Sequence, residues 1–429
     1  MRDALRRIAR VRPTRRGVAL AVAGAGLVVT GMLLGLPDVV GVGVAGIAVV
    51  AMAWLSQGLG RLDSGRGALS VSRRVSPDPV VRGQEAATDL LVTAARRSAV
   101  AYERLGRIRL SEQAAHELAG DGGVRARVSA QPDRIQVHYS IHPARRGRWP
   151  LGPLLTTRTD AFGLVRTTQP LGAPTIVSVW PRTTELPVGK GLLGDLEHAG
   201  AGARLTAPDD AVLREYVAGD DPRRVHWPTA ARQGRLMVRA DEAAGVRPVS
   251  VLLDRALLTA PGESRSVAGL THAHGEWSVE LAASLACSFL EAGHPVRLVA
   301  TMRAPSVGSF VTGSNSGRPA LLDVTVDLHG HRTLADADAA LAATAQALRA
   351  GHAPGDVAVA VLRPPTPEGL RELAAMSTEG TTCLALVVGE AAACAQSAAA
   401  LRSAGWHVAT APAGTAHEKA WATLSERAA

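Results

Sequence analysis

Two acids and a histidine lie close together in a segment that is dense in arginine. Asp220, Asp221 and His226 could act in acid–base chemistry, because a histidine near carboxylates can titrate near neutral pH. The same residues could instead cap a helix and form ion pairs, since Asp221 precedes Pro222, a favoured first residue of a helix. We favour the structural role, because structural ion-pair networks shift pKa values as well.

A second candidate site contains two histidines at alternate positions. His272 and His274, with Glu276 nearby, would have a spacing suited to a metal ion if they lay on a strand. Residues 260–276, however, are rich in Gly, Ser and Pro, which predicts a mobile loop. We therefore expect both histidines to be solvated.

The remaining chemically interesting residues do not form a site. Gly189-Lys190-Gly191 lacks the upstream glycine of a phosphate-binding loop and predicts a turn. The three cysteines have no metal-ligand spacing and lie among apolar residues, so we expect small core side chains in a reducing compartment. They are Cys287, Cys383 and Cys394.

Two long apolar runs near the N-terminus predict a helical hairpin in a membrane. Residues 17–36 contain no charge and are long enough to cross a hydrocarbon core of about 30 Å. A turn at Pro37 precedes a second uncharged run, 39–55, near the lower limit for spanning. Residues 1–16 hold seven arginines and one acid, and arginine-rich flanks stay in the cytoplasm. We therefore expect a cell-membrane protein with two helices and cytoplasmic soluble domains.

The charge distribution argues against a nucleic-acid partner. The formal net charge is +9, but most of it lies in the basic segment 1–16, and the rest of the chain is close to neutral. Aromatic residues make up only 3% of the chain, which is too few for a base-stacking platform.

The soluble part divides into two patterns. Period-two alternation with frequent turn residues predicts an antiparallel β-sandwich of about seven strands. After about Arg247, apolar runs without alternation are each followed by an Ala- and Leu-rich helical stretch, which predicts a mostly parallel sheet covered on both faces. The expected divisions are a basic segment 1–16, a hairpin 17–57, a β domain 68–200, a charged segment 201–246 and an α/β domain 247–429.

The α/β elements can be placed individually. The expected strands are 249–254, 296–300, 357–362, 383–388 and 407–410. The expected helices are 277–292, 334–349, 368–376, 392–404 and 418–427. A second Gly-, Ser- and Pro-rich segment, 304–319, predicts another mobile loop.

Residues 214–242 have a balanced charge, with six arginines, five acids and two aromatic rings. This composition predicts a network in which guanidinium groups bridge carboxylates and stack on rings. Gly234 could end a helix here, before a strand at 236–238. The spaced positions of interest are Arg214, Glu215, Tyr216, Gly219, Asp220, Arg223, Arg224, Trp227, Ala231, Arg232, Gly234, Leu236, Arg239 and Glu242.

At these positions the chain resembles the bacterial family called domain of unknown function 58. The resemblance extends upstream to Arg145-Arg146-Gly147, Leu151-Gly152-Pro153 and Asp160-Ala161-Phe162-Gly163-Leu164. His226 departs from the family pattern, in which an Asp often precedes the Trp. The resemblance implies a membrane hairpin, a β domain and a C-terminal domain similar to the von Willebrand factor A fold, usually beside MoxR-type AAA ATPases.

The implied fold also directs attention to Asp254. Von Willebrand factor A domains bind a divalent cation when their first strand ends in D-x-S-x-S, because the acid and two hydroxyls supply hard oxygen ligands. Here Ala256 and Leu258 occupy the hydroxyl positions. We therefore expect a degenerate site, without metal or cofactor.

Two classes of function follow from these observations. The first is a non-enzymatic membrane adaptor or scaffold whose sheet domain docks a MoxR-type AAA ATPase. The second is a hydrolase-like enzyme centred on residues 220–226. The missing hydroxyls and the lack of an evident nucleophile–base pair favour the adaptor.

Overall fold

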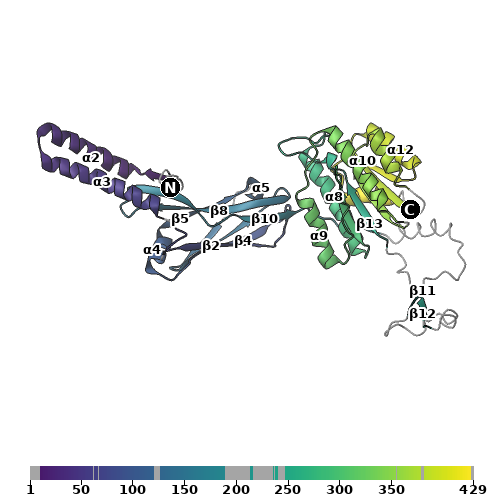
Figure 1. Ribbon diagram of the computed structural model, residues 1–429, viewed down its shortest axis with the longest axis horizontal. Coiled ribbons are helices and arrows are strands. Elements are labelled where there is room, and N and C mark those ends of the chain that lie inside the picture. The colour runs from purple at the N-terminus through teal and green to yellow at the C-terminus, as the bar shows by residue number, and fades with distance from the viewer. Residues whose placement is uncertain are drawn as a thin grey trace. The chain divides into compact units, whose positions relative to one another are not determined.

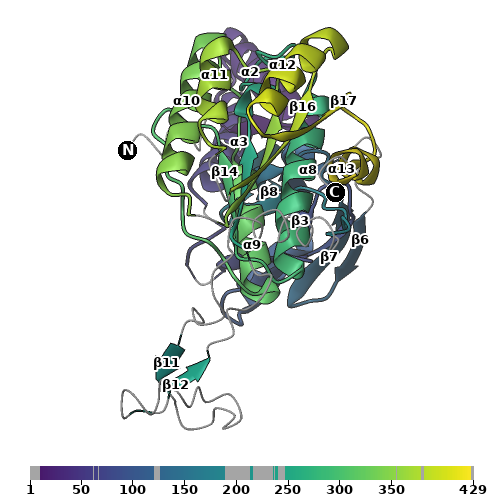
Figure 2. The ribbon, with the colours of Figure 1, turned by 90° about the vertical axis from the view of Figure 1, so that its right-hand side faces the viewer.

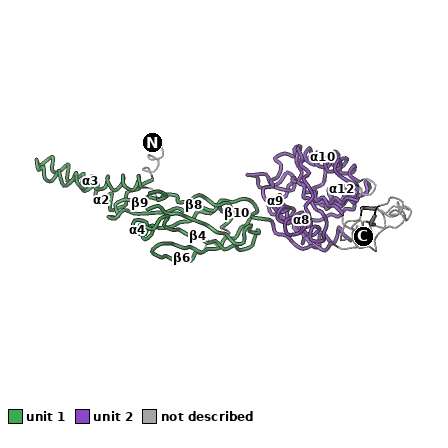
Figure 3. Tube along the Cα trace, turned by 60° about the horizontal axis from the view of Figure 1, so that its bottom comes forward, with its two compact units in different colours: residues 1–180 green, residues 181–429 purple. Residues whose placement is uncertain are grey.

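The computed structural model describes residues 10–60, 62–65, 67–119, 126–188, 213–215, 235, 237–239, 247–353, 355–377 and 381–426. The chain divides into two compact units, residues 1–180 and 181–429 (Figure 3). The first unit therefore ends earlier than the expected limit at residue 200, because residues after Trp180 hydrogen-bond within the second unit.

Unit 1 begins with two antiparallel helices, α2 (Arg15–Leu34) and α3 (Pro37–Leu59) (Figure 1). The Thr14 side chain caps α2 by accepting from the Gly17 N–H, and Gly35 ends it in the left-handed conformation at a φ of 62°. Helix α2 begins and ends two residues before the expected run 17–36, whereas α3 extends beyond the expected run 39–55 at both ends, with Pro37 at its start. Each is long and apolar enough to cross a membrane.

Small residues let the two helices approach closely. A Cβ added to Gly24 would lie 2.8 Å from the carbonyl oxygen of Gly43, and one added to Gly43 would lie 2.6 Å from that of Gly24. Gly31 packs against Val40 in the same way. Gly35, by contrast, serves as the cap that ends α2.

The other described elements of unit 1 form two sheets and two short helices. One sheet has the order β1-β9-β8-β10-β3, with β5 also paired to β8, and the other has the order β2-β4-β7-β6. The first sheet contains β1 (Val11–Pro13), β3 (Val80–Val81), β5 (Ile108–Ala114), β8 (Gly147–Thr159), β9 (Val165–Leu171) and β10 (Thr175–Trp180). The second contains β2 (Leu69–Ser76), β4 (Ala86–Ala94), β6 (Ala126–Ala130) and β7 (Arg134–Ile141), and the helices are α4 (Ala99–Arg107) and α5 (His116–Ala119).

The two sheets share one hydrophobic core. Leu90 and Val137 of one sheet and Leu151 and Leu154 of the other belong to a single cluster of buried side chains. Alternation along β7, whose residues are in turn exposed or buried, explains why one face of the strand turns inward.

Two pairings in unit 1 differ from the expectation. Strand β3 runs parallel to β10, and β1 pairs with β9 although it lies in the segment expected to be only a basic flank. The physical reason for the second is that Val11 is buried against Leu164 and Val165, so a short apolar stretch among the arginines joins the sheet.

The turn between β8 and β9 joins the hairpin to the β domain, and it carries the sequence Asp160-Ala161-Phe162-Gly163-Leu164. The Asp160 carboxylate accepts from the backbone N–H groups of Val165 at 2.7 Å and Phe162 at 3.0 Å. Thr14, which precedes α2, donates its hydroxyl to the Gly163 carbonyl. A Cβ on Gly17 would overlap the Leu164 carbonyl at 2.1 Å, so the first turn of α2 needs glycine there.

Unit 2 contains a five-stranded parallel sheet, as expected, in the order β14-β13-β15-β16-β17. Strands such as β13 and β15 are buried along their whole length and largely apolar, the pattern of a sheet covered on both faces. They are β13 (Val249–Leu253), β14 (Val296–Ala300), β15 (Val357–Leu362), β16 (Thr382–Val388) and β17 (His407–Ala411). The helices are α8 (His272–Glu291), α9 (Ser314–Val326), α10 (Leu334–Ala350), α11 (Pro367–Ala374), α12 (Ala391–Ser403) and α13 (His417–Ser425).

The helices cover both faces of this sheet. Val251 and Val359 face a cluster with Phe289 of α8, Leu321 of α9 and Trp421 of α13. The alternate residues of the strands face a cluster that includes side chains of α10, α11 and α12. Figure 2 shows α10 and α11 on one side of the strands and α8 on the other.

Helix α9 and the first turn of α8 replace parts of the two expected mobile loops. Thr271 caps α8 by accepting from the His274 N–H, which starts the helix before Trp277. Leu321, Leu322 and Val326 of α9 are buried. Tertiary packing of these side chains outweighs the low helix propensity of the Ser, Gly and Pro residues in the same helix.

An extended segment, residues 181–188, lies along α8 and opens unit 2. The backbone N–H groups of Arg182, Thr184 and Leu186 donate to the side chains of Glu280, Ser284 and Ser288, respectively, at 3.2, 2.9 and 3.0 Å. Two extended residues span about 6.6 Å and four helical residues about 6 Å. Every second N–H group of the segment therefore lies opposite every fourth side chain of α8. We call residues 181–188 the strap.

The three cysteines are free and buried, as expected. Burial raises the pKa of the Cys287 thiol to about 11 and that of the Cys383 thiol to about 12. Both are therefore protonated and unreactive near neutral pH.

Candidate functional site

The carboxyl ends of β13 and β15 define the candidate site of unit 2. The chain passes from β13 outward to β14 and then to β15 on the opposite side of β13, so the strand order reverses between β13 and β15. Ligands of open α/β sheets bind at such a switch point. Asp254 follows β13 there, and Arg363 follows β15.

Asp254 is fully buried at this edge. Its Oδ1 accepts from the Ala256 N–H at 2.9 Å, which starts a short 3-10 turn. Its Oδ2 lies 3.6 Å from the Nε of Arg363, whose residue exposure is only 4%. Burial raises the pKa of Asp254 above its ordinary value, against the opposing effect of the nearby guanidinium.

A second acid completes the cluster. The Nη2 of Arg363 donates to Oδ1 of Asp338, on α10, and its Nη1 donates to the Pro364 carbonyl at 3.0 Å. Three elements thus bring together one cation and two acids, and we call Asp254, Asp338 and Arg363 the switch-point triad. The sequence pointed to Asp254 as a remnant of a cation site, but it did not indicate that Arg363 and Asp338 would pair with it. A charged residue directly after the apolar run 357–362 was the available signal for Arg363.

The residues at this edge do not fit a divalent cation. Ala256 and Leu258 are buried and apolar, so neither can ligate, and a guanidinium lies beside the carboxylate. Across the described ranges there is also no group of three His, Cys, Asp or Glu side chains that could hold a metal ion.

We expect Mg²⁺ and Mn²⁺ to leave the melting temperature of the full-length protein unchanged. A cation bound at about 100 times its Kd would add about 2.7 kcal/mol of stability. Thermal unfolding in detergent, with either metal or with a chelator, measures this. A metal-dependent rise of several degrees that disappears in Asp254→Asn would contradict the expectation.

The rim of this edge carries apolar side chains that are open to solvent. Leu334, at the start of α10, is 48% exposed, and Met302, just after β14, is also exposed. Arg303 and Asp336 form an exposed ion pair between them at 2.6 Å. We call Met302, Arg303, Leu334 and Asp336 the edge surface.

The two histidines of the second candidate site lie in the first turn of α8, so the expectation of a loop there is wrong. The Nδ1 of His272 is 3.0 Å from the Thr259 hydroxyl, and its Nε2 is 3.5 Å from Oε1 of Glu276, one helical turn on. His272 therefore ties the turn after β13 to the start of α8.

Only a small part of the charged segment 214–242 lies within the described residues. Strand β11 (Leu213–Glu215) pairs antiparallel with β12 (Met237–Arg239), so Arg214 lies opposite Val238. Strand β12 starts one residue later than the expected strand. The other positions lie outside the described residues, as does the turn expected at 189–191. They are Tyr216, Gly219, Asp220, Asp221, Arg223, Arg224, His226, Trp227, Ala231, Arg232, Gly234, Leu236 and Glu242.

The described elements define a class: a chain with two apolar N-terminal helices, a β domain and an α/β domain whose parallel sheet has a triad at its switch point. Residues 212–352 match the family model described as "Protein of unknown function DUF58", which confirms the resemblance found at residues 214–242.

Two further comparisons give little or no similarity. No curated protein matches the chain. Among solved structures, the chain is similar to "von Willebrand factor type A from Catenulispora acidiphila", with 16% sequence identity and a TM-score of 0.29. That similarity covers 43% of this chain and 42% of the other, so this chain spans less than half the length of the structure it matches.

Proposed function

We propose that this protein is a membrane-anchored, non-enzymatic adaptor that recruits a MoxR-type AAA ATPase through the edge surface of unit 2. The observation that carries the proposal is the switch-point triad. A guanidinium and two carboxylates fill the position at which comparable sheets bind a small ligand, and the surrounding rim offers apolar contacts instead.

The hairpin supports the membrane anchor. Only 17% of the apolar window of α2 and 6% of that of α3 are buried, so most apolar side chains of both helices point outward. Such surfaces need a hydrocarbon environment. Arg12, Arg15 and Arg16 flank the start of α2, which favours cytoplasmic termini and a short connection at Pro37 on the other side.

The finer arrangement follows the family resemblance. We assign the two sheets of unit 1 to a β-sandwich and unit 2 to a von Willebrand factor A-like domain. The parallel sheet of unit 2, with an acid after its first strand, supports the second assignment. The alternative of a hydrolase rests on residues 220–226, outside the described residues.

The edge surface has the chemistry of a protein contact. Two exposed apolar side chains flank an exposed ion pair, a mixture typical of transient interfaces that must also remain soluble when free. The surface lies on the loop after β14 and on the first turn of α10, at the edge of a parallel sheet where binding residues commonly occur.

The test is affinity purification of the full-length protein from its own membranes, with ATP, ADP or no nucleotide. We expect enrichment of an AAA ATPase that depends on nucleotide state and falls about tenfold in Leu334→Asp, because a charge at an apolar contact costs at least about 1.4 kcal/mol.

The matched control is Val324→Asp, on α9, where the native side chain is 47% exposed. This variant makes the same kind of change at an equally exposed position away from the edge surface, and it should retain the partner. If no AAA ATPase is enriched in any nucleotide state, or if both variants behave alike, the assignment is wrong.

A further inference from the structure

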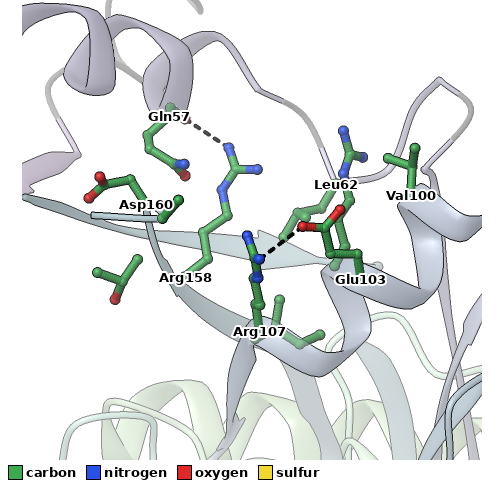
Figure 4. A pocket seen from close by; sticks show the side chains of 11 residues that line it. Gln57, Leu62, Val100, Glu103, Arg107, Arg158 and Asp160 are labelled. Carbon is green, nitrogen blue, oxygen red and sulfur yellow. Dashed lines mark hydrogen bonds and ion pairs between the residues drawn. The ribbon is translucent and has the colours of Figure 1, made fainter. Parts of the chain in front are cut away.

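A small pocket in unit 1 lies at the C-terminal end of α3. Its volume is about 180 Å³, and its polar lining comes from α3, α4, β8 and the β8–β9 turn (Figure 4). The charged side chains in it are Arg104, Arg107, Arg158, Glu103 and Asp160.

Arg158 joins the pocket to the end of α3. Its Nη2 donates to the carbonyl oxygens of Gln57 and Gly60, both at 2.9 Å, and so caps the last turn of the helix. Its Nε is enclosed and has no hydrogen-bond partner among the described residues. Burial, and to a lesser extent the nearby Arg104, lowers the pKa of Arg158.

The two acids do not neutralise the pocket. The Asp160 carboxylate accepts two backbone N–H groups of its own turn. Glu103 pairs with Arg107 one helical turn away at 3.0 Å, with both side chains more than half exposed, and such a pair stabilises little. Among the described side chains that line the pocket, three arginines against two acids leave a formal charge of +1.

The pocket lies at the level where the proposed membrane-spanning part of the chain ends. Gln57 belongs to the last turn of α3, and the headgroup region of a bilayer begins where the hydrocarbon core ends. Phe162, in the same turn as Asp160, is 73% exposed, and Val100, which lines the pocket, is 47% exposed. Exposed apolar side chains therefore lie next to the charged ones. This combination suits a membrane surface.

We propose that this pocket binds the phosphodiester of an anionic phospholipid headgroup. A singly charged diester matches the +1 of the pocket, and guanidinium groups pair with phosphate oxygens in a fixed geometry. The inference rests on the proposed membrane anchoring and is independent of the proposed ATPase.

The test uses the full-length protein in nanodiscs of phosphatidylcholine that contain a minority of phosphatidylglycerol. After mild detergent extraction, native mass spectrometry counts the retained phospholipids by class. We expect the wild type to retain phosphatidylglycerol selectively and Arg107→Gln to retain about fivefold less, the ratio expected for one basic charge near a membrane surface. Arg107 is the best position to change because it is exposed and caps no helix.

The matched control is Arg109→Gln, an exposed arginine two residues away that does not line the pocket. It removes the same charge and should retain the lipid. A second variant, Arg158→Lys, keeps the charge but loses the forked geometry, and it should also bind less.

Competition with inorganic phosphate distinguishes a headgroup from a free anion. Displacement of phosphatidylglycerol by phosphate at low concentration would identify a soluble anion as the ligand and overturn the headgroup assignment. Equal retention of phosphatidylglycerol by Arg107→Gln and Arg109→Gln would overturn the assignment of the pocket as the lipid-binding site. Release of the protein from membranes by alkaline carbonate would instead contradict the membrane anchor itself.

Discussion

Replacement of Arg363 by methionine is expected to lower the free energy of unfolding of unit 2 by about 3–5 kcal/mol. Arg363 is buried and forms ion pairs with both Asp254 and Asp338. Its removal therefore deprives both acids at the switch point of the cation they share. Methionine keeps much of the side-chain volume, which limits the effect of a cavity. Chemical unfolding of the full-length protein in detergent, followed by tryptophan fluorescence, measures the change.

Two variants serve as controls for this result. Asp254→Asn should cost less than Arg363→Met, because Asp338 still pairs with the guanidinium. Arg349→Met removes an exposed arginine that lies 3.7 Å from Glu372 and should cost at most about 1 kcal/mol. Equal destabilisation by Arg363→Met and Arg349→Met would contradict a buried triad.

The destabilisation caused by Arg363→Met should depend on pH in a definite direction. Burial raises the pKa of Asp254 above the unfolded value of 3.8, so the folded protein binds this proton more tightly than the unfolded chain does. The stability from this group is greatest below the unfolded pKa and is lost as pH rises through the folded pKa. Arg363 opposes this rise in pKa, so its removal raises the pKa of Asp254 further and more stability is lost as the pH rises. The difference in the free energy of unfolding between wild type and Arg363→Met should therefore become smaller toward acid pH.

Replacement of Trp421 by alanine is expected to destabilise unit 2 by about 3–5 kcal/mol, because it empties a large volume in a close-packed core. Trp421 is 1% exposed, and its ring meets the ring of Phe289 edge-on with centroids 5.8 Å apart. Its Nε1 donates to the Pro187 carbonyl at 2.8 Å, so the change also removes a contact with the strap. Far-ultraviolet circular dichroism during urea unfolding measures the loss.

Hydrogen exchange gives this prediction a local measurement. The backbone N–H of Thr184 is bonded to Ser284, and its protection should fall in Trp421→Ala as the strap loosens. Trp421→Phe should cost less, about 1 kcal/mol for the lost hydrogen bond plus a smaller cavity. Lys419→Ala, an exposed change on the same helix, should be nearly neutral. Unchanged protection of Thr184 in the alanine variant would show that Trp421 does not hold the strap.

The sheet of unit 2 was predictable because its strands are buried on both faces. Short continuous apolar runs such as 357–362 are typical of strands in a parallel sheet covered on both faces. The observed limits of the five strands differ from the expected limits by at most one residue. Helix α9 was not predictable, since Gly317 and Pro319 argue against a helix and only the burial of Leu321 and Leu322 reveals why it forms.

The site was less predictable than the fold. The missing hydroxyls at Ala256 and Leu258 are visible in the sequence, but the pairing of Asp254 with a residue more than a hundred positions later is a consequence of strand order. Likewise, nothing near Arg158 in sequence indicates that it caps a helix that ends at Leu59. Contacts set by topology are not encoded locally, so patterns of spacing cannot find them.

The strap determines how unit 2 resists a pull on the chain. Its three side-chain hydrogen bonds are spaced one helical turn apart, and the strap runs in the same direction as α8. A force applied at Trp180 along the helix axis loads all three bonds in shear, whereas a force perpendicular to the axis peels them one by one. The acceptors on α8 recur only every four residues. The strap must therefore shift along α8 by about 6 Å, roughly one helical turn, before its N–H groups reach new acceptors. Unit 2 would therefore resist a pull at Trp180 in steps of about one helical turn.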